Sequence, residues 1–103
     1  MYSRINRIMQ NICNHPTFPF GNGQVQVNYV VEQANAIEHL NIKVFDLPYS
    51  IQFDVRETGY GKLEVQSYLW EEDEQLWEPI ECIVGDESNI TFHIINEITN
   101  GYY

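Results

Sequence analysis

The strongest constraint on the fold is a period-two alternation of apolar and polar residues after Gln24. Successive side chains of a β-strand point to opposite faces, so alternation gathers the apolar side chains of each strand on one face. One apolar and one polar face is typical of an antiparallel sheet that is covered on one side. We therefore expect a meander of about five strands. The alternating segments are residues 24–31, 42–47, 51–56, 63–70, 77–84 and 90–94.

The start of the chain follows a helical period instead. Ser3 is a favourable N-cap, and the residues after it form one apolar stripe with the spacing i, i+3, i+4 and i+7. Prolines and glycines in residues 14–23 end this helix. The pattern predicts an α+β fold in which an N-terminal amphipathic helix packs on one face of the sheet. The stripe consists of Ile5, Ile8, Met9 and Ile12.

The length of 103 residues predicts one domain over residues 1–103. A chain of this size with 44% hydrophobic residues can build a core without disulfides. Within the domain we expect four regions in chain order. They are a helix over 3–13, a loop over 14–23, a β-rich region over 24–98 and a C-terminal tail over 99–103.

Cysteine usage and hydropathy predict the compartment. Cys13 and Cys82 lie far apart and show no metal-ligand spacing, so we expect free thiols in a reducing environment. The first residues lack the apolar run of a signal peptide, and no segment approaches the ~20 apolar residues of a membrane span. The expectation is a cytoplasmic protein without membrane contacts.

The net charge of −10 is distributed unevenly along the chain. Residues 1–31 contain no Asp or Glu, whereas residues 63–103 contain ten acids and no Lys or Arg. Such asymmetry is a signal for a charged partner. Two alternatives remain open. The opposite poles can neutralise one another within the fold, or they can meet between subunits of a homo-oligomer.

A run of four acids, Glu71–Glu74, separates the two tryptophans. We expect a hairpin here, in which Trp70 lies opposite Trp77 and Gln66 lies opposite Glu81. Because side chains alternate strictly, this register sends both tryptophans to the outer face of the sheet. The final strand, 90–94, adds His93 to the same face. The register assigns to the buried side Leu63, Val65, Leu69, Ile80, Cys82 and Val84.

This arrangement predicts a partner-binding surface made of aromatic anchors and carboxylates. Like charges on neighbouring strands repel, and a partner would relieve that repulsion while covering the aromatics. The alternative is purely structural, because cross-strand aromatic pairs stabilise hairpins by themselves. The predicted partner-binding residues are Asp54, Glu64, Tyr68, Trp70, Glu71, Glu72, Asp73, Glu74, Trp77 and Glu81.

Direct binding of nucleic acid is disfavoured, since this surface would repel phosphates. A basic protein surface that normally holds nucleic acid is the natural complement. The sequence thus predicts a small acidic inhibitor of a nucleic-acid-handling protein. Its charge and size resemble those of phage anti-defence, anti-CRISPR-like or nuclease-immunity proteins.

Two other function classes remain as alternatives. Oppositely charged ends and the tyrosines of the tail are compatible with a self-assembling structural or adaptor subunit. A hydrolase would need a carboxylate pair such as Asp54 and Glu64, but one sheet offers little concavity and no catalytic motif is present. We therefore expect no enzymatic activity and no cofactor. We also expect no metal site, because the histidines and cysteines are scattered along the sequence.

Overall fold

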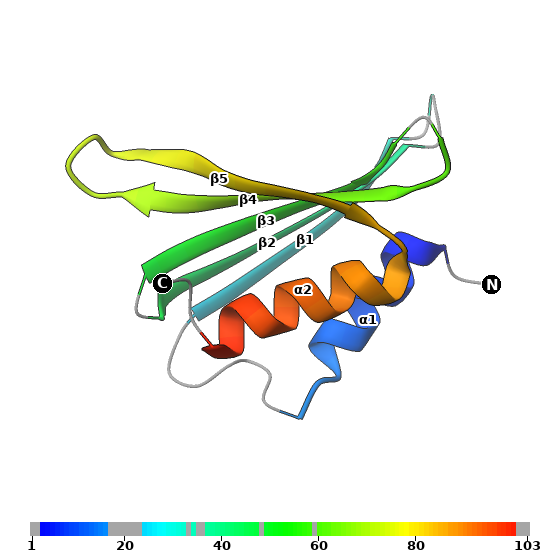
Figure 1. Cartoon of the computed structure of the whole chain (residues 1–103), viewed down its shortest axis with the longest axis horizontal. Coiled ribbons are helices and arrows are strands. Elements are labelled where there is room, and N and C mark those ends of the chain that lie inside the picture. Colours follow the sequence, from blue (N-terminus) through cyan, green and yellow to red (C-terminus); the bar gives the residue numbers. More distant parts are fainter. Residues whose placement is uncertain are drawn as a thin grey trace.

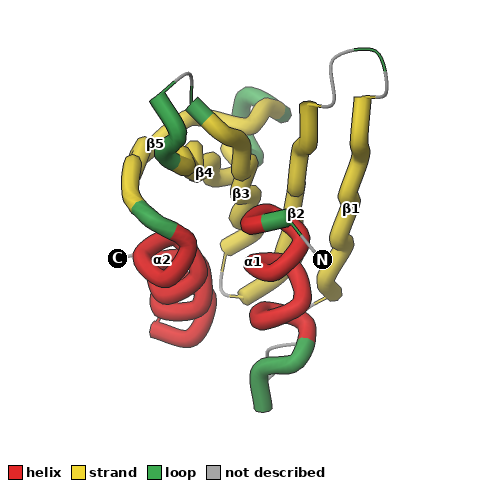
Figure 2. The backbone as a smooth tube through the Cα atoms, turned by 90° about the vertical axis from the view of Figure 1, so that its right-hand side faces the viewer, coloured by secondary structure: helices red, strands yellow, loops and turns green. Residues whose placement is uncertain are grey.

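The computed structural model describes residues 3–16, 24–32, 34, 37–47, 49–58 and 60–100. Five strands form one antiparallel sheet in the order β1-β2-β3-β4-β5, and two helices lie side by side against it (Figures 1 and 2). The α+β class and the antiparallel meander are therefore confirmed. The elements are α1 (Arg4–Cys13), β1 (Gln24–Glu32), β2 (Ile37–Leu47), β3 (Tyr49–Glu57), β4 (Leu63–Glu71), β5 (Leu76–Gly85) and α2 (Glu87–Asn100).

Local capping and packing explain where α1 lies. The Ser3 side chain accepts a hydrogen bond from the backbone N–H of Asn6 at 3.1 Å, which satisfies one of the unpaired donors of the first turn. Ile5, Ile8 and Ile12 are fully buried against the sheet and the second helix. The helix thus forms from the cap and apolar stripe that the sequence indicates.

The core fills the space between the two helices and one face of the sheet. Phe53 of β3 is its largest fully buried side chain. The apolar residues that alternate along β2, β3 and β4 point to this face, and three isoleucines from each helix cover them. The sheet residues in the core are Leu40, Ile42, Val44, Ile51, Phe53, Val55, Leu63 and Val65.

The segment expected to be the last strand is instead the middle of α2. The β-rich region ends at Gly85, and residues 90–94 are helical. The Asp86 carboxylate accepts the backbone N–H of Asn89 at 2.9 Å and so caps the helix. Ile90, Ile94 and Ile98 then fall on one buried face at spacings of four. This prediction was wrong because β-branched residues with period-two spacing were read as a strand, although the same residues also fit a helical period.

The β4–β5 hairpin keeps the expected register near its turn and changes it further along. Trp70 lies opposite Trp77, but Ser67 lies opposite Glu81, so Ile80 is an extra residue in β5. This irregularity is a β-bulge. It directly follows Pro79, which has no N–H to donate to the ladder and is tolerated because β5 is an edge strand of the sheet.

The bulge reverses the faces of β5 relative to the sequence expectation. Cys82 is exposed and Val84 is 56% exposed, whereas Ile83 packs against the core. Glu81 points to the helix side, opposite the buried Ser67. The predicted burial of Cys82 and Val84 and the predicted outer position of Glu81 were therefore wrong.

Ion pairs connect the basic start of the chain to acids from later segments. Arg7 of α1 donates to Glu87 of α2 at 2.7 Å, and Arg4 donates to Glu57 of β3 at 3.1 Å. These contacts are partly exposed and each contributes little to stability. They nevertheless show that part of the charge asymmetry is neutralised within the fold.

The predicted loop and the predicted C-terminal tail lie partly outside the described residues. Most of the predicted loop, residues 17–23, and residues 101–103 of the predicted tail fall outside them. Thr99 and Asn100 belong to α2 rather than to a tail. Neither helix in the described part of the chain is long and apolar enough to span a membrane.

Two substitutions distinguish a helix from a strand over residues 90–94. In α2 Ile94 is fully buried and Phe92 is 70% exposed, whereas in a strand both would share one face. We expect Ile94→Ala to lower the free energy of unfolding by about 2–5 kcal/mol and Phe92→Ala to change it by less than ~0.5 kcal/mol. Urea denaturation measures both, and similar losses for the two variants would contradict the helical assignment.

Candidate functional site

An aromatic cluster lies on the outer face of the sheet, which is the face opposite the helices. The rings of Trp70 and Trp77 meet edge to face with their centroids 5.4 Å apart, at an interplanar angle of 65°. Phe45 of β2 packs against Trp77 at 6.4 Å. Such edge-to-face pairs add about 0.5–1.5 kcal/mol beyond the burial of area. Both indoles remain partly exposed, so the pair stabilises the hairpin and also offers a surface.

A depression with a volume of about 380 Å³ borders this cluster. Its size falls within the range of pockets that hold small molecules or single side chains. The walls combine aromatic surface with one cation and one carboxylate, so they suit an amphipathic group. The lining residues are Lys43, Phe45, Ser50, Trp70, Glu72 and Trp77.

The acidic turn, residues 71–75, is fixed beside the tryptophans by hydrogen bonds. Trp70 Nε1 donates to the Glu72 carboxylate at 2.8 Å. The Gln75 side chain donates to the Glu72 carbonyl at 2.7 Å, and the Gln75 backbone has a positive φ of 57°. Glu72, Asp73 and Glu74 are all exposed. The Glu72 carboxylate is thus fixed, and three exposed acids lie at the end of the hairpin, which extends beyond the neighbouring strands (Figure 1).

The remaining predicted residues form a less acidic surface than expected. Glu64 accepts from Arg56 at 2.9 Å, which neutralises its charge. Asp54 lies opposite the uncharged Gln66. Because Glu81 is on the other side of the sheet, the expected cluster of three carboxylates on neighbouring strands does not form.

The structure therefore divides the ten predicted residues between two faces and a turn. Tyr68 lies next to Pro79 and Gln52 on the outer face, one strand position from Leu69, which is partly buried and faces the core. The outer face also carries Asp54, Glu64, Trp70 and Trp77, while Glu71, Glu72, Asp73 and Glu74 form the acidic turn. Glu81 alone lies on the helix side.

Sequence reasoning missed the contribution of β2 to this site. Phe45 and Lys43 alternate with the buried Ile42 and Val44, so their outward direction was visible in the sequence. Their proximity to the tryptophans depends on the register between β2, β3 and β4, which alternation alone does not determine. His93 was also misplaced, since it belongs to α2 and lies beside Glu97 rather than on the outer face.

No protein-family model, curated protein or solved structure matches the chain. The function is therefore inferred from the side chains that the described surface presents.

The outer position of Cys82 can be tested by its chemical reactivity. Desolvation raises the pKa of the Cys82 thiol, and the negative charge of Glu64 raises it further. Because the thiolate is the reactive form, Glu64→Gln should accelerate alkylation by iodoacetamide at pH 8 in a Cys13→Ser background. Mass spectrometry follows the reaction in native buffer. If Cys82 reacts only after denaturant is added, the thiol is buried and the bulge is absent.

Proposed function

We propose that this protein is an inhibitor that binds the basic, nucleic-acid-binding surface of a target protein through the tip of the β4–β5 hairpin. It acts in the cytoplasm by occupying that surface, without catalysis and without a cofactor. One observation carries the proposal. The partly exposed pair of Trp70 and Trp77 lies beside an acidic turn with three exposed acids, one of which, Glu72, accepts a hydrogen bond from Trp70.

The tryptophan pair supplies the anchor of the interface. Aromatic side chains are enriched at the centres of protein interfaces, where a few of them carry most of the binding free energy. The edge-to-face contact between Trp70 and Trp77 holds both rings in place before binding, which lowers the entropic cost of association. The depression beside them can receive one side chain of the target.

The acidic turn supplies the charge that selects a basic target. Glu72, Asp73 and Glu74 present three exposed carboxylates close together in sequence, an acidic charge that can replace phosphates. Complementary charge accelerates association and makes its rate sensitive to salt. Lys43 lines the depression and adds one positive charge beside the acidic tip of the hairpin. Tyr68 continues the surface along the outer face, whereas Asp54 and the Glu64–Arg56 pair lie farther from the tip.

Neutralising two acids of the turn should slow association with the target. We expect Asp73→Asn with Glu74→Gln to lower the association rate several-fold at low salt and to flatten its salt dependence. The matched control is Glu32→Gln with Glu57→Gln, which removes the same charge at the opposite end of the sheet and should leave the rate nearly unchanged. The target is first captured from lysate on the immobilised protein, and kinetics are then measured by biolayer interferometry.

Competition decides whether the bound surface is the one that holds nucleic acid. A labelled oligonucleotide bound to the captured target should be displaced by the wild-type chain and not by a Trp70→Ala, Trp77→Ala variant. Simultaneous binding of the chain and the oligonucleotide would contradict the proposal. Recovery of the chain alone would favour self-assembly, for which the edge strand β1 offers the exposed Val30 and Val31.

A further inference from the structure

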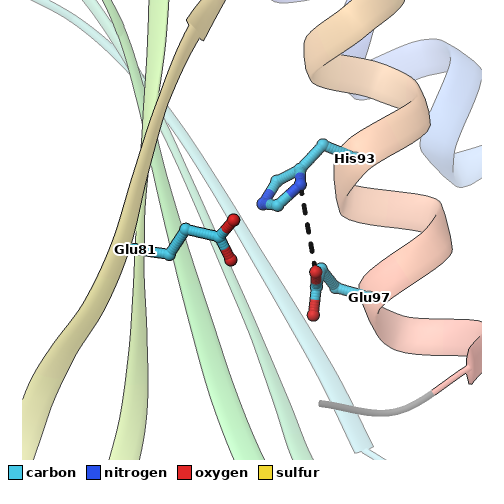
Figure 3. A group of neighbouring side chains, drawn as sticks. All are labelled: Glu81, His93 and Glu97. Atoms are coloured by element: carbon cyan, nitrogen blue, oxygen red, sulfur yellow. Dashed lines mark ion pairs between the residues drawn. The ribbon is translucent and has the colours of Figure 1, made fainter. Parts of the chain in front are cut away.

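Three side chains with metal-binding atoms converge between β5 and α2, on the helix side of the sheet. Glu81 comes from β5, and His93 and Glu97 lie one helical turn apart on α2 (Figure 3). One potential ligand atom of each residue lies within 4.8 Å of the other two. His93 Nδ1 is 4.0 Å from a carboxylate oxygen of Glu97. The group is separate from the outer face used in the proposed function.

The histidine of this group is held in place but incompletely paired. Its side chain is only 13% exposed, and the ring of Phe53 packs edge-on against it at 6.5 Å. Nε2 of His93 is buried and has no hydrogen-bond partner among the described residues. A buried polar atom without a partner costs about 1–3 kcal/mol, so such atoms are rare in folded proteins.

A second unpaired polar atom belongs to Ser67, the residue opposite Glu81 in the sheet. Ser67 is 1% exposed, and its hydroxyl has no partner among the described residues. In the sheet Ser67 lies between Glu81 on β5 and Phe53 on β3, and Phe53 is the residue that contacts His93. These two buried polar atoms and the two carboxylates offer bonding capacity that a polar occupant could satisfy.

The charges around this space favour a cation as that occupant. Both carboxylates are only partly exposed, and in the described part of the chain no Lys or Arg forms an ion pair with Glu81 or Glu97. A divalent ion would relieve both the desolvation and the mutual repulsion of the carboxylates.

We propose that Glu81, His93 and Glu97 bind a divalent first-row transition-metal ion. One imidazole nitrogen with two carboxylate oxygens is a donor set that Zn²⁺ accepts, with a fourth position open for water. Metal–ligand bonds of about 2.0–2.2 Å require the three donors to approach one another by small side-chain rotations.

Calorimetric titration with ZnCl₂ tests the site on the full chain. A Cys13→Ser, Cys82→Ser background removes competing thiol ligands. We expect one saturable Zn²⁺ site, weakened at least tenfold by His93→Gln and by Glu97→Gln. His39→Gln is the matched control, because His39 is exposed on β2, and it should leave the affinity unchanged. Mg²⁺ should not reproduce the binding. Diffuse attraction to an acidic surface would bind Mg²⁺ and Zn²⁺ alike, so this comparison distinguishes it from a specific site.

A second measurement does not depend on how the variants fold. In ¹⁵N-resolved spectra that observe histidine ring nitrogens, Zn²⁺ should shift the His93 resonances and leave those of His39 in place. Unchanged His93 resonances, or Zn²⁺ binding that survives His93→Gln with undiminished affinity, would overturn the proposal.

Discussion

Side chains alternate strictly between the two faces of a strand, so one extra residue in β5 exchanges the faces of every residue beyond it. Before the bulge, Trp77 and Pro79 share the outer face with Trp70 and Tyr68. After it, Glu81 points toward α2, and Cys82 takes the outer position. The hairpin therefore supplies an aromatic surface to one side of the sheet and a carboxylate to the other. The proposed metal site depends on that exchange, whereas the tryptophan pair lies on the outer face with or without it.

The same exchange explains how α2 closes the core. Ile83, now on the inner face, packs against the cluster that contains Ile90, Ile94 and Phe53. Burial of these apolar side chains supplies most of the free energy that holds α2 on the sheet. Fixing α2 also fixes His93 above Phe53 and brings His93 and Glu97 to Glu81. The polar cluster is thus positioned by apolar packing around it.

The local patterns predicted a large part of this fold. The Ser3 cap, the stripe of Ile5 and Ile8 and the alternation in β3 each depend on neighbouring residues alone, and so could be read from the sequence. The pairing of Trp70 with Trp77 also followed from alternation around a turn. The bulge could not be located in this way, because alternation assumes an unbroken ladder, although Pro79 was a visible warning.

The second helix was missed for a related reason. The isoleucines of α2 satisfy a period of two as well as a period of four, and β-branched residues favour strands by propensity. The decisive signal was Asp86, whose side chain caps the helix. That error placed His93 on a strand, and the grouping of Glu81, His93 and Glu97 was consequently hidden. Tertiary contacts such as that of Phe45 with Trp77 are set by strand register, which local patterns do not specify.

The most direct test of this account is the cross-strand pairing of β4 and β5 in solution. Nuclear Overhauser contacts between backbone protons report which residues lie opposite each other. The bulge predicts contacts that pair Gln66 with Cys82 and Ser67 with Glu81, while Trp70 still pairs with Trp77. Contacts that pair Gln66 with Glu81 would show an unbroken ladder. That result would return Glu81 to the outer face and contradict the division of chemistry between the two faces.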